Sequence, residues 1–180
     1  TARNVLEIYQ KEIGRLDRSE VLTEEKYPLN EFQLKAFNEL NHQFIDKKTV
    51  LLHGITSSGK TELYIHLIEQ TLAEKKQVLY LVPEIALTTQ LTSRLKRIFG
   101  NKLAVYHSRF SDAERVEIWN NMLQDKGYEV VIGARSAVFI PFRQLGLVIV
   151  DEEHETSYKQ FDPAPRYNAR NAAIVLASLH

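Results

Sequence analysis

Residues 49–61 read Thr-Val-Leu-Leu-His-Gly-Ile-Thr-Ser-Ser-Gly-Lys-Thr, an apolar segment that runs directly into a glycine-containing turn. Residues 54–61 fit G-x-x-x-x-G-K-[ST], the nucleotide-phosphate loop, whose context is a strand before it and a helix after it. Gly54 and Gly59 permit backbone angles and a close approach that a β-carbon would prevent. The N–H groups of the loop and of the following helix then face a polyanion. The stretch therefore predicts a site for the phosphates of a nucleoside triphosphate.

The polar residues of this loop have distinct expected roles. Lys60 brings a positive charge to the β- and γ-phosphates, and the hydroxyl group of Thr61 is a ligand for Mg²⁺. The expected nucleotide-binding residues of the motif are Gly54, Ser57, Ser58, Gly59, Lys60 and Thr61.

A second apolar segment, residues 147–150, ends in Asp151-Glu152-Glu153-His154. Open α/β sheets bind ligands at the C-terminal ends of their strands, so we expect these carboxylates beside the phosphate loop. Asp151 is expected to hold the same Mg²⁺, and Glu152 to orient or deprotonate the attacking water. His154 is expected to orient its neighbours rather than to bind a metal. The two segments together predict ATP hydrolysis with Lys60, Asp151 and Glu152 as catalytic residues.

Composition restricts the class of protein. The chain has 180 residues, of which 44% are hydrophobic and 26% charged, as in ordinary globular domains. Its 23 basic and 23 acidic side chains balance, so any nucleic-acid surface must be local. The absence of cysteine excludes disulfides and thiolate metal sites and fits a cytoplasmic protein. No apolar run reaches the length of a membrane span.

The chain divides into two regions. Residues 1–28 are charged and lack a sustained period, which indicates a linker or the end of an upstream DNA-binding region. From residue 29 onward, apolar segments at 49–53, 78–82, 103–106, 129–132 and 147–150 alternate with helical patterns. Asn30 with Gln33, and Ser111 with Glu114, fit capping boxes, and Asn168 is expected to open the last helix. This alternation predicts an α/β domain whose mostly parallel sheet has helices on both faces.

Two groups of residues point to a second ligand along the same edge of the sheet. Thr88, Ser108, Arg135 and Ser136 follow strand ends and suit contacts to a phosphate backbone; ordinary loop polarity is the alternative. Residues 158–167 interleave aromatic and basic side chains, a pattern suited to stacking on single-stranded bases. The expected residues of this loop are Tyr158, Lys159, Phe161, Arg166 and Tyr167. The alternative is that Phe161 and Tyr167 pack beneath the loop.

The ordered set of motifs resembles the first motor lobe of superfamily 2 helicases, and within them the primosomal replication-restart DNA helicases. The matching stretches lie within residues 51–62, 81–88, 107–119, 133–142 and 150–154, and at residues 157–160 and 165–170. The resemblance implies a RecA-like P-loop NTPase fold. It also implies an ATP- and Mg²⁺-dependent DNA helicase that moves 3′ to 5′ and assembles primosomes at stalled forks. Gln33 stands where the family has a glutamine that reads adenine.

The resemblance has further implications. Residues 158–167 match an aromatic-rich loop that links single-stranded DNA to ATP turnover. Partners would be single-stranded and forked DNA, replication-restart proteins and single-stranded-DNA-binding protein, at forks on the nucleoid. Zinc would be bound in a later region. Residues 29–180 would be the first lobe, truncated before the second and inactive or weak alone. Ser58 and Asn171 depart from the glycine and aspartate usual in the family.

Three other readings follow from the same residues. A different superfamily 2 translocase, such as a branch-migration motor, shares Lys60 and Asp151 but not the pattern of residues 157–170. A small-molecule kinase or transporter-type ATPase has no use for a basic and aromatic loop after the acidic motif. A non-catalytic DNA-binding or loader-docking module would keep its function after Lys60→Ala.

Overall fold

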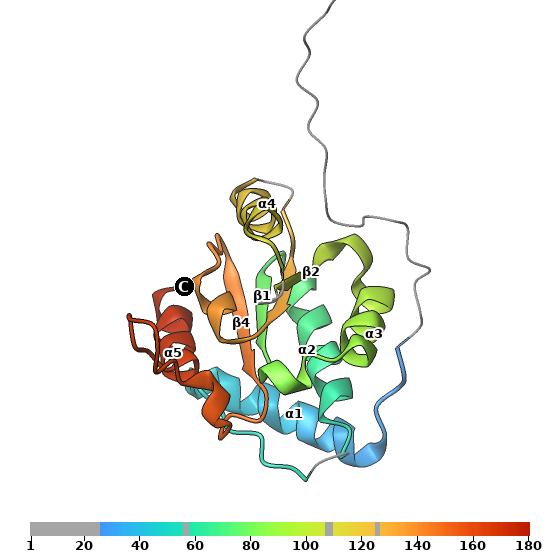
Figure 1. Cartoon of the computed structure of the whole chain (residues 1–180). Helices are drawn as coiled ribbons and strands as arrows, with labels where there is room; N and C mark the ends of the chain where they lie inside the picture. The colour runs from blue at the N-terminus through green and yellow to red at the C-terminus, as the bar shows by residue number, and fades with distance from the viewer. Residues whose placement is uncertain (1–25, 56–57, 107–109, 125–126) are drawn as a thin grey trace, which may run out of the picture.

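The fold is built on a four-stranded parallel sheet with the strand order β2-β3-β1-β4. The computed structural model describes residues 26–55, 58–106, 110–124 and 127–180. In chain order the strands are β1 (Gln77–Leu81), β2 (Leu103–Tyr106), β3 (Val130–Gly133) and β4 (Leu145–Val150). Because all the pairings are parallel, the C-terminal ends of these strands lie at one edge of the sheet (Figure 1).

The strands form where the sequence has short, continuous apolar runs, as expected for strands that are buried on both faces. In β1, Val78 and Tyr80 belong to one apolar cluster, whereas Leu79 and Leu81 belong to the other. In β3, Val131 belongs to the cluster of Leu79 and Leu81, whereas its neighbours belong to the cluster of Val78 and Tyr80. Two cores therefore lie on opposite faces of the sheet.

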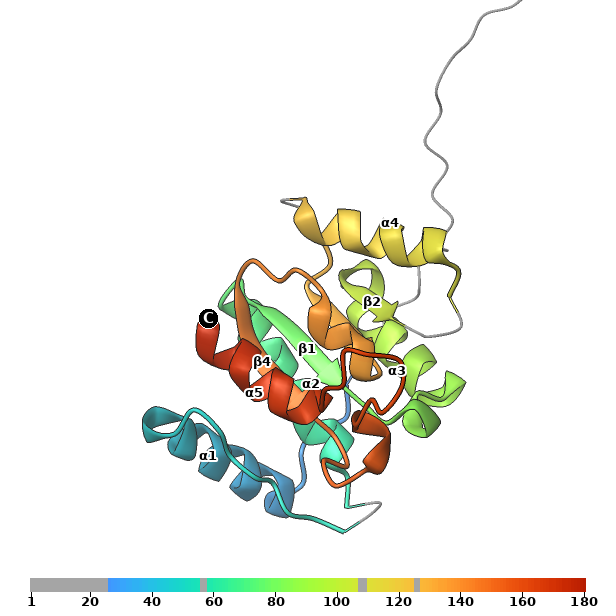
Figure 2. The ribbon, with the colours of Figure 1, turned by 60° about the vertical axis from the view of Figure 1, so that its left-hand side comes forward.

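Each face is covered by its own set of helices. The first core joins α2 (Lys60–Ala73) and α3 (Thr89–Phe99) to the sheet. The second core joins α4 (Asp112–Leu123), the short helix η3 (Arg135–Phe139) and α5 (Ala169–Leu179) to the opposite face. Helix α1 (Glu31–Asp46) lies outside this sandwich next to α2 (Figure 2). The predicted α/β fold with helices on both faces is confirmed.

Most predicted helix starts are confirmed. Asn30 and Ser111 each form a complete capping box, and the side chain of Asn168 accepts a hydrogen bond from the N–H of Asn171 at the start of α5. The helix predicted near residues 86–99 is divided. A short helix η1 (Glu84–Ala86) ends before extended Thr88, which caps α3. The remaining short helices are η2 (Gly100–Lys102) and η4 (Thr156–Tyr158).

The strand predicted at residues 49–53 is wrong. These residues lie outside the sheet, Leu51 is 72% exposed, and β4 pairs with β1 alone among the described strands. Leu52 packs partly against the core on the α2 side. A short apolar run forms a strand only when a neighbouring strand pairs with it, and residues 49–53 pair with none of the described strands.

The predicted linker at residues 1–28 lies largely outside the described residues. Lys26 pairs with Glu69, and the guanidinium group of Arg94 lies over the ring of Tyr27. Over the part of the chain that the structure describes, none of the helices combines the length and the apolar character needed to cross a membrane.

Ile132 offers a test of the core. Its side chain is fully buried in the core between the sheet and α2. Ile132→Ala should therefore lower the free energy of unfolding by about 2–5 kcal/mol. Ile174 is 46% exposed on α5, and Ile174→Ala should change the free energy of unfolding by about 0.5 kcal/mol or less. Urea unfolding followed by circular dichroism measures both values. Equal losses in the two variants would contradict this placement of the core.

Candidate active site

The described part of the phosphate loop leads into α2 through Gly59. Gly59 is the N-cap residue and has φ +81°, a left-handed conformation that favours glycine. The side-chain amide of Gln33 lies 3.4 Å from the carbonyl oxygen of Gly59, and a β-carbon on Gly59 would come within 2.3 Å of that nitrogen. Gln33 thus connects α1 to the loop. Its Oε1 also accepts a hydrogen bond from the N–H of Asn30. Ser57 lies outside the described residues, and Ser58 is exposed.

Lys60 brings the two predicted motifs together. Its Nζ donates to the carbonyl oxygen of Gly54 at 2.9 Å and lies 3.3 Å from Oε1 of Glu152, which is 92 residues away in sequence. Glu152 has φ +46°, a strained conformation for a residue with a β-carbon. Strain of this kind persists where the surroundings determine the backbone, and here it accompanies a carboxylate turned toward Lys60.

The carboxylate of Asp151 has hydrogen-bond partners on both of its oxygens. Its Oδ1 accepts from the hydroxyl of Tyr64 at 3.3 Å and from the N–H of Glu152 at 3.1 Å. Its Oδ2 accepts from the hydroxyl of Tyr80 at 3.2 Å. The hydroxyl of Tyr158 donates to its main-chain carbonyl at 2.6 Å. Three tyrosines from three separate elements therefore surround one aspartate.

These tyrosines remain protonated donors. Burial raises the pKa of Tyr64, Tyr80 and Tyr158 above the ordinary value of 10.0, and the negative charge of Asp151 raises it further. A neutral phenol can orient a carboxylate without cancelling its charge. The three tyrosines therefore hold Asp151 through neutral donors.

The residues present fit a magnesium ion bound together with a nucleotide. Mg²⁺ is usually held by one or two protein oxygen ligands together with substrate phosphates and water. Thr61 is the second residue of α2, and Tyr64, one turn further on, reaches Asp151. This places the hydroxyl-bearing first turn of α2 on the side of the Asp151 carboxylate. Within the described ranges, no group of three or more His, Cys, Asp or Glu residues could hold a metal ion. The Nε2 of His154 lies 3.9 Å from Glu152.

The loop of residues 158–167 is a closed turn rather than an open row of rings. Its ends are joined by an antiparallel bridge between Lys159 and Asn168, and the amide of Gln160 donates to the carbonyls of Pro163 and Pro165. Phe161 is 67% exposed at the tip. Tyr167 packs edge-on against Phe139, with ring centroids 4.9 Å apart. The expectation of outward-facing rings therefore holds for Phe161 only.

Tyr158 corrects the expectation that this residue contacts DNA at the surface. Its side chain is 1% exposed, and its hydroxyl lies within hydrogen-bonding distance of the carbonyls of Asp151 and Leu81. A phenol hydroxyl needs a partner when its ring is buried, and the two strand ends provide one. Lys159, which follows it, is half-buried, whereas Arg166 is exposed.

Thr88, Arg135 and Ser136 are among the described residues, and their contact with DNA stays a prediction. Thr88 is exposed at the start of α3, and its hydroxyl accepts from the N–H of Leu91. Arg135 and Ser136 begin η3, just after the end of β3, and are half-buried. Ser108 lies outside the described residues. The departure at Asn171 is accommodated locally, because its side-chain oxygen accepts from Arg170, which also pairs with Glu153 at 2.6 Å.

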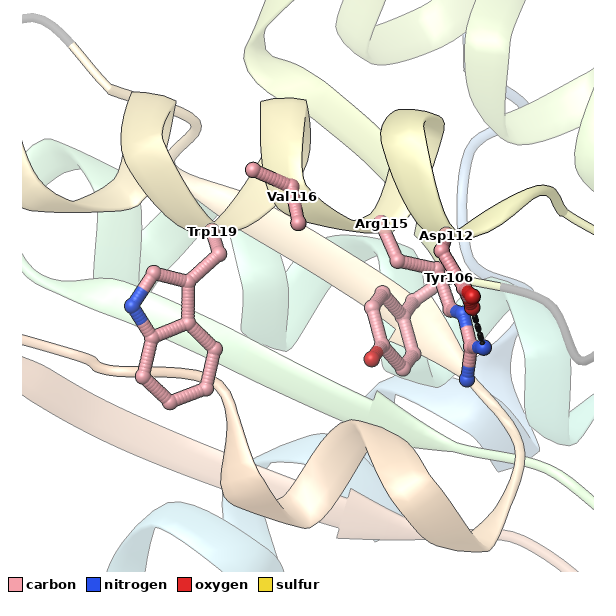
Figure 3. A pocket seen from close by; sticks show the side chains of 5 residues that line it. All are labelled: Tyr106, Asp112, Arg115, Val116 and Trp119. Carbon is pink, nitrogen blue, oxygen red and sulfur yellow. Dashed lines mark hydrogen bonds and ion pairs between the residues drawn. The ribbon is translucent and has the colours of Figure 1, made fainter.

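Sequence reasoning missed Tyr64 and Tyr80, and it also missed a shallow groove beside β2. The groove is lined by Tyr106, Asp112, Arg115, Val116 and Trp119 (Figure 3). Arg115 pairs with Asp112 there, so the groove is not a basic surface of the kind that binds a phosphate backbone. Helical spacing offered one signal for Tyr64, since a residue four positions after Lys60 lies on the same side of α2.

Comparison with known proteins defines the class. A family model described as DEAD/DEAH box helicase matches residues 30–178. That range includes both ends of the Lys60–Glu152 contact and nearly all of the described fold. The chain belongs to the DEAD/DEAH box helicase family, and membership implies the use of ATP and Mg²⁺.

Individual relatives show which helicases of this family the chain is similar to. The chain is similar to replication restart protein PriA of Bacillus subtilis (46% identity over 158 residues, 87% of this chain and 19% of the relative). It is also similar to PriA of Synechocystis (52% over 131 residues, 72% and 16%) and of Chlamydia trachomatis (44% over 149 residues, 82% and 20%). The resemblance to replication-restart helicases is thus confirmed. The chain spans no more than 20% of the length of each of these three relatives.

The buried tyrosines predict a dependence of stability on alkaline pH. Above pH 10 an unfolded tyrosine loses its proton, whereas the raised pKa of Tyr158 keeps it protonated in the folded chain. The free energy of unfolding should therefore be at its full value below pH 10 and fall as the pH rises above it. Tyr158→Phe should reduce the slope of this fall. Urea unfolding at pH values from about 9 to about 11 measures the slopes. Identical slopes for the parent and Tyr158→Phe would contradict this account.

Proposed function

We propose that this chain is the ATP-binding lobe of a DNA helicase that acts in replication restart. The observation that carries the proposal is the contact of Lys60 with Glu152, beside the anchored Asp151, in a member of the DEAD/DEAH box helicase family. The full protein would move 3′ to 5′ on DNA and assemble primosomes at stalled or recombined forks. Residues 29–180 would form the first RecA-like lobe, and residues 1–28 would connect it to an upstream DNA-binding region.

The chemistry assigned to this lobe is hydrolysis of ATP. Lys60 would bind the β- and γ-phosphates, and Thr61 with Asp151 would hold Mg²⁺, which neutralises charge on the phosphates. Glu152 would orient or deprotonate the attacking water. Because Lys60 contacts Glu152 at 3.3 Å, its engagement by phosphate would free that carboxylate for the water. Gln33 would contact adenine from α1, in addition to its contact with Gly59.

Contact with DNA is assigned to the edge of the sheet that carries these residues. Thr88, Ser108, Arg135 and Ser136 would bind the backbone, and Phe161 would stack on a base. Lys159, Arg166 and Tyr167 would support this contact. Tyr158 would act inside the protein, because its hydroxyl joins the DNA-facing loop to Asp151. The expected partners are single-stranded and forked DNA, replication-restart proteins and single-stranded-DNA-binding protein. Zinc would belong to a later region, and the protein would work in the cytoplasm at forks.

The alternative function is that of another superfamily 2 translocase, such as a branch-migration motor. Lys60, Asp151 and Glu152 would serve it equally well. The similarity to PriA relatives favours replication restart. A preference of the purified protein for four-way junctions over forks would favour the alternative.

The ATPase rate of the full-length protein, measured with and without single-stranded DNA, tests the proposal. DNA should stimulate the rate strongly, and Lys60→Ala should lower it by about 100-fold or more, because a charge that stabilises the transferring phosphoryl group is lost. Phe161→Ala should raise the DNA concentration for half-maximal stimulation by about 5-fold or more, since stacking on one base contributes about 1–3 kcal/mol.

Phe44→Ala is the matched control for the loop, because Phe44 is a 40% exposed phenylalanine on α1. It should leave the DNA dependence unchanged. An ATPase rate that does not change when DNA is added would refute the helicase function. Function retained in full by Lys60→Ala would indicate a docking module instead.

Unwinding of partial duplexes tests polarity and the role of the lobe. The full-length protein should unwind a duplex with a 3′ single-stranded overhang and should leave one with a 5′ overhang intact. The 180-residue chain should unwind neither, because catalysis in this superfamily requires a second lobe to complete the ATP cleft. Strand displacement measured by fluorescence would show both results. Unwinding by the 180-residue chain alone would contradict the proposal that catalysis requires a second lobe.

A further inference from the structure

Asp151 receives hydroxyl hydrogen bonds from elements that are distant in sequence. Tyr64 lies on α2, 87 residues before Asp151, and Tyr80 lies on β1, 71 residues before it. Each donates to a different carboxylate oxygen, at 3.3 Å and 3.2 Å. The N–H of Glu152 is a third donor, to Oδ1 at 3.1 Å, and donors on both oxygens fix the rotation of the carboxylate as well as its position.

The two tyrosines also support each other. Their rings pack edge to face, with centroids 5.5 Å apart, and both side chains are buried, Tyr64 with 8% and Tyr80 with 0% exposed. Neither hydroxyl can swing into solvent without breaking this packing. The arrangement is therefore a rigid support for Asp151.

The location of Tyr64 connects this support to the nucleotide site. Tyr64 lies one helical turn after Lys60 and Thr61, on the helix that the phosphate loop opens. The Tyr64 hydroxyl therefore connects the helix that follows the phosphate loop to the carboxylate of Asp151. Tyr80 provides the fixed reference, since it belongs to a central strand of the sheet.

We propose that Tyr64 and Tyr80 are positioning residues that orient the Asp151 carboxylate for the magnesium ion bound with the nucleotide. The proposal rests on the proposed function, because it assumes that Asp151 binds Mg²⁺. Partners behind a metal ligand set its orientation, and their loss commonly lowers metal affinity by about 10-fold to 100-fold. The hydroxyls supply this orientation while leaving the carboxylate charge intact for the ion.

The test is the Mg²⁺ dependence of nucleotide binding by the full-length protein, followed with a fluorescent ATP analogue. For the variant with both Tyr64→Phe and Tyr80→Phe, the Mg²⁺ concentration for half-maximal tightening should rise by about 10-fold. Affinity for the analogue in EDTA should equal that of the parent. Tyr64→Phe alone, which removes one hydroxyl, should show a smaller rise. Thermal unfolding followed by circular dichroism verifies that each variant is folded.

Tyr128→Phe is the matched control, because Tyr128 precedes β3 at the edge of the sheet opposite Asp151. It should leave the Mg²⁺ dependence unchanged. An unchanged Mg²⁺ requirement in the single and double variants would overturn the proposal. An equal loss of affinity with and without Mg²⁺ would also overturn it, since that result indicates packing alone.

The outcomes separate this inference from the proposed function. A parent protein that binds nucleotide with Mg²⁺ but ignores DNA would refute the helicase assignment, while the tyrosine variants would still give their own answer. A parent that shows no Mg²⁺-dependent nucleotide binding would overturn both.

Discussion

The parallel pairing of β1 with β4 is the constraint on which the site depends. Leu81 lies opposite Val150, and the N–H of Asp151 continues the ladder by donating to the carbonyl of Leu81 at 2.9 Å. This register brings Asp151 within reach of Tyr80, on the face that α2 covers. Side chains alternate between the faces, so a slip of one residue would turn the aspartate to the opposite core. The contact between Lys60 and Glu152 depends on the same register.

Local patterns predicted the frame of the molecule well. The buried strands appear as apolar runs, and the capping boxes at Asn30 and Ser111 require only residues three positions apart. The meeting of Lys60 with the acidic motif was predicted as well, although the strand at residues 49–53 on which that prediction relied does not form. The segment at 49–53 shows the limit of such patterns. Its apolar residues satisfy a strand pattern, yet only contacts with distant residues decide whether a strand forms.

The tyrosines show a second limit. Tyr64 and Tyr80 belong to no motif, and Tyr158 was expected to contact DNA. Their common target, Asp151, becomes visible only when α2, β1 and η4 are folded around β4. Alternation of aromatic and basic residues predicted that the loop after the acidic motif would expose its rings. This pattern could not distinguish Phe161 from Tyr158. Phe161 has no polar group and is exposed, whereas Tyr158 is buried and its hydroxyl donates to a main-chain carbonyl inside the protein.

The two carboxylates of the site are held by opposite kinds of partner, and this difference assigns them different behaviour in the proposed reaction. Glu152 faces the cation of Lys60, which an incoming phosphate would compete for, so Glu152 must lose a partner when nucleotide binds. Asp151 is held by neutral hydroxyls and by main-chain groups, none of which is attracted to phosphate as a cation is. Nucleotide binding would therefore release Glu152 toward water and leave Asp151 in place. In the proposed reaction Asp151 would hold the metal ion and Glu152 would activate water, and the neutral partners of the first and the charged partner of the second would suit these two roles.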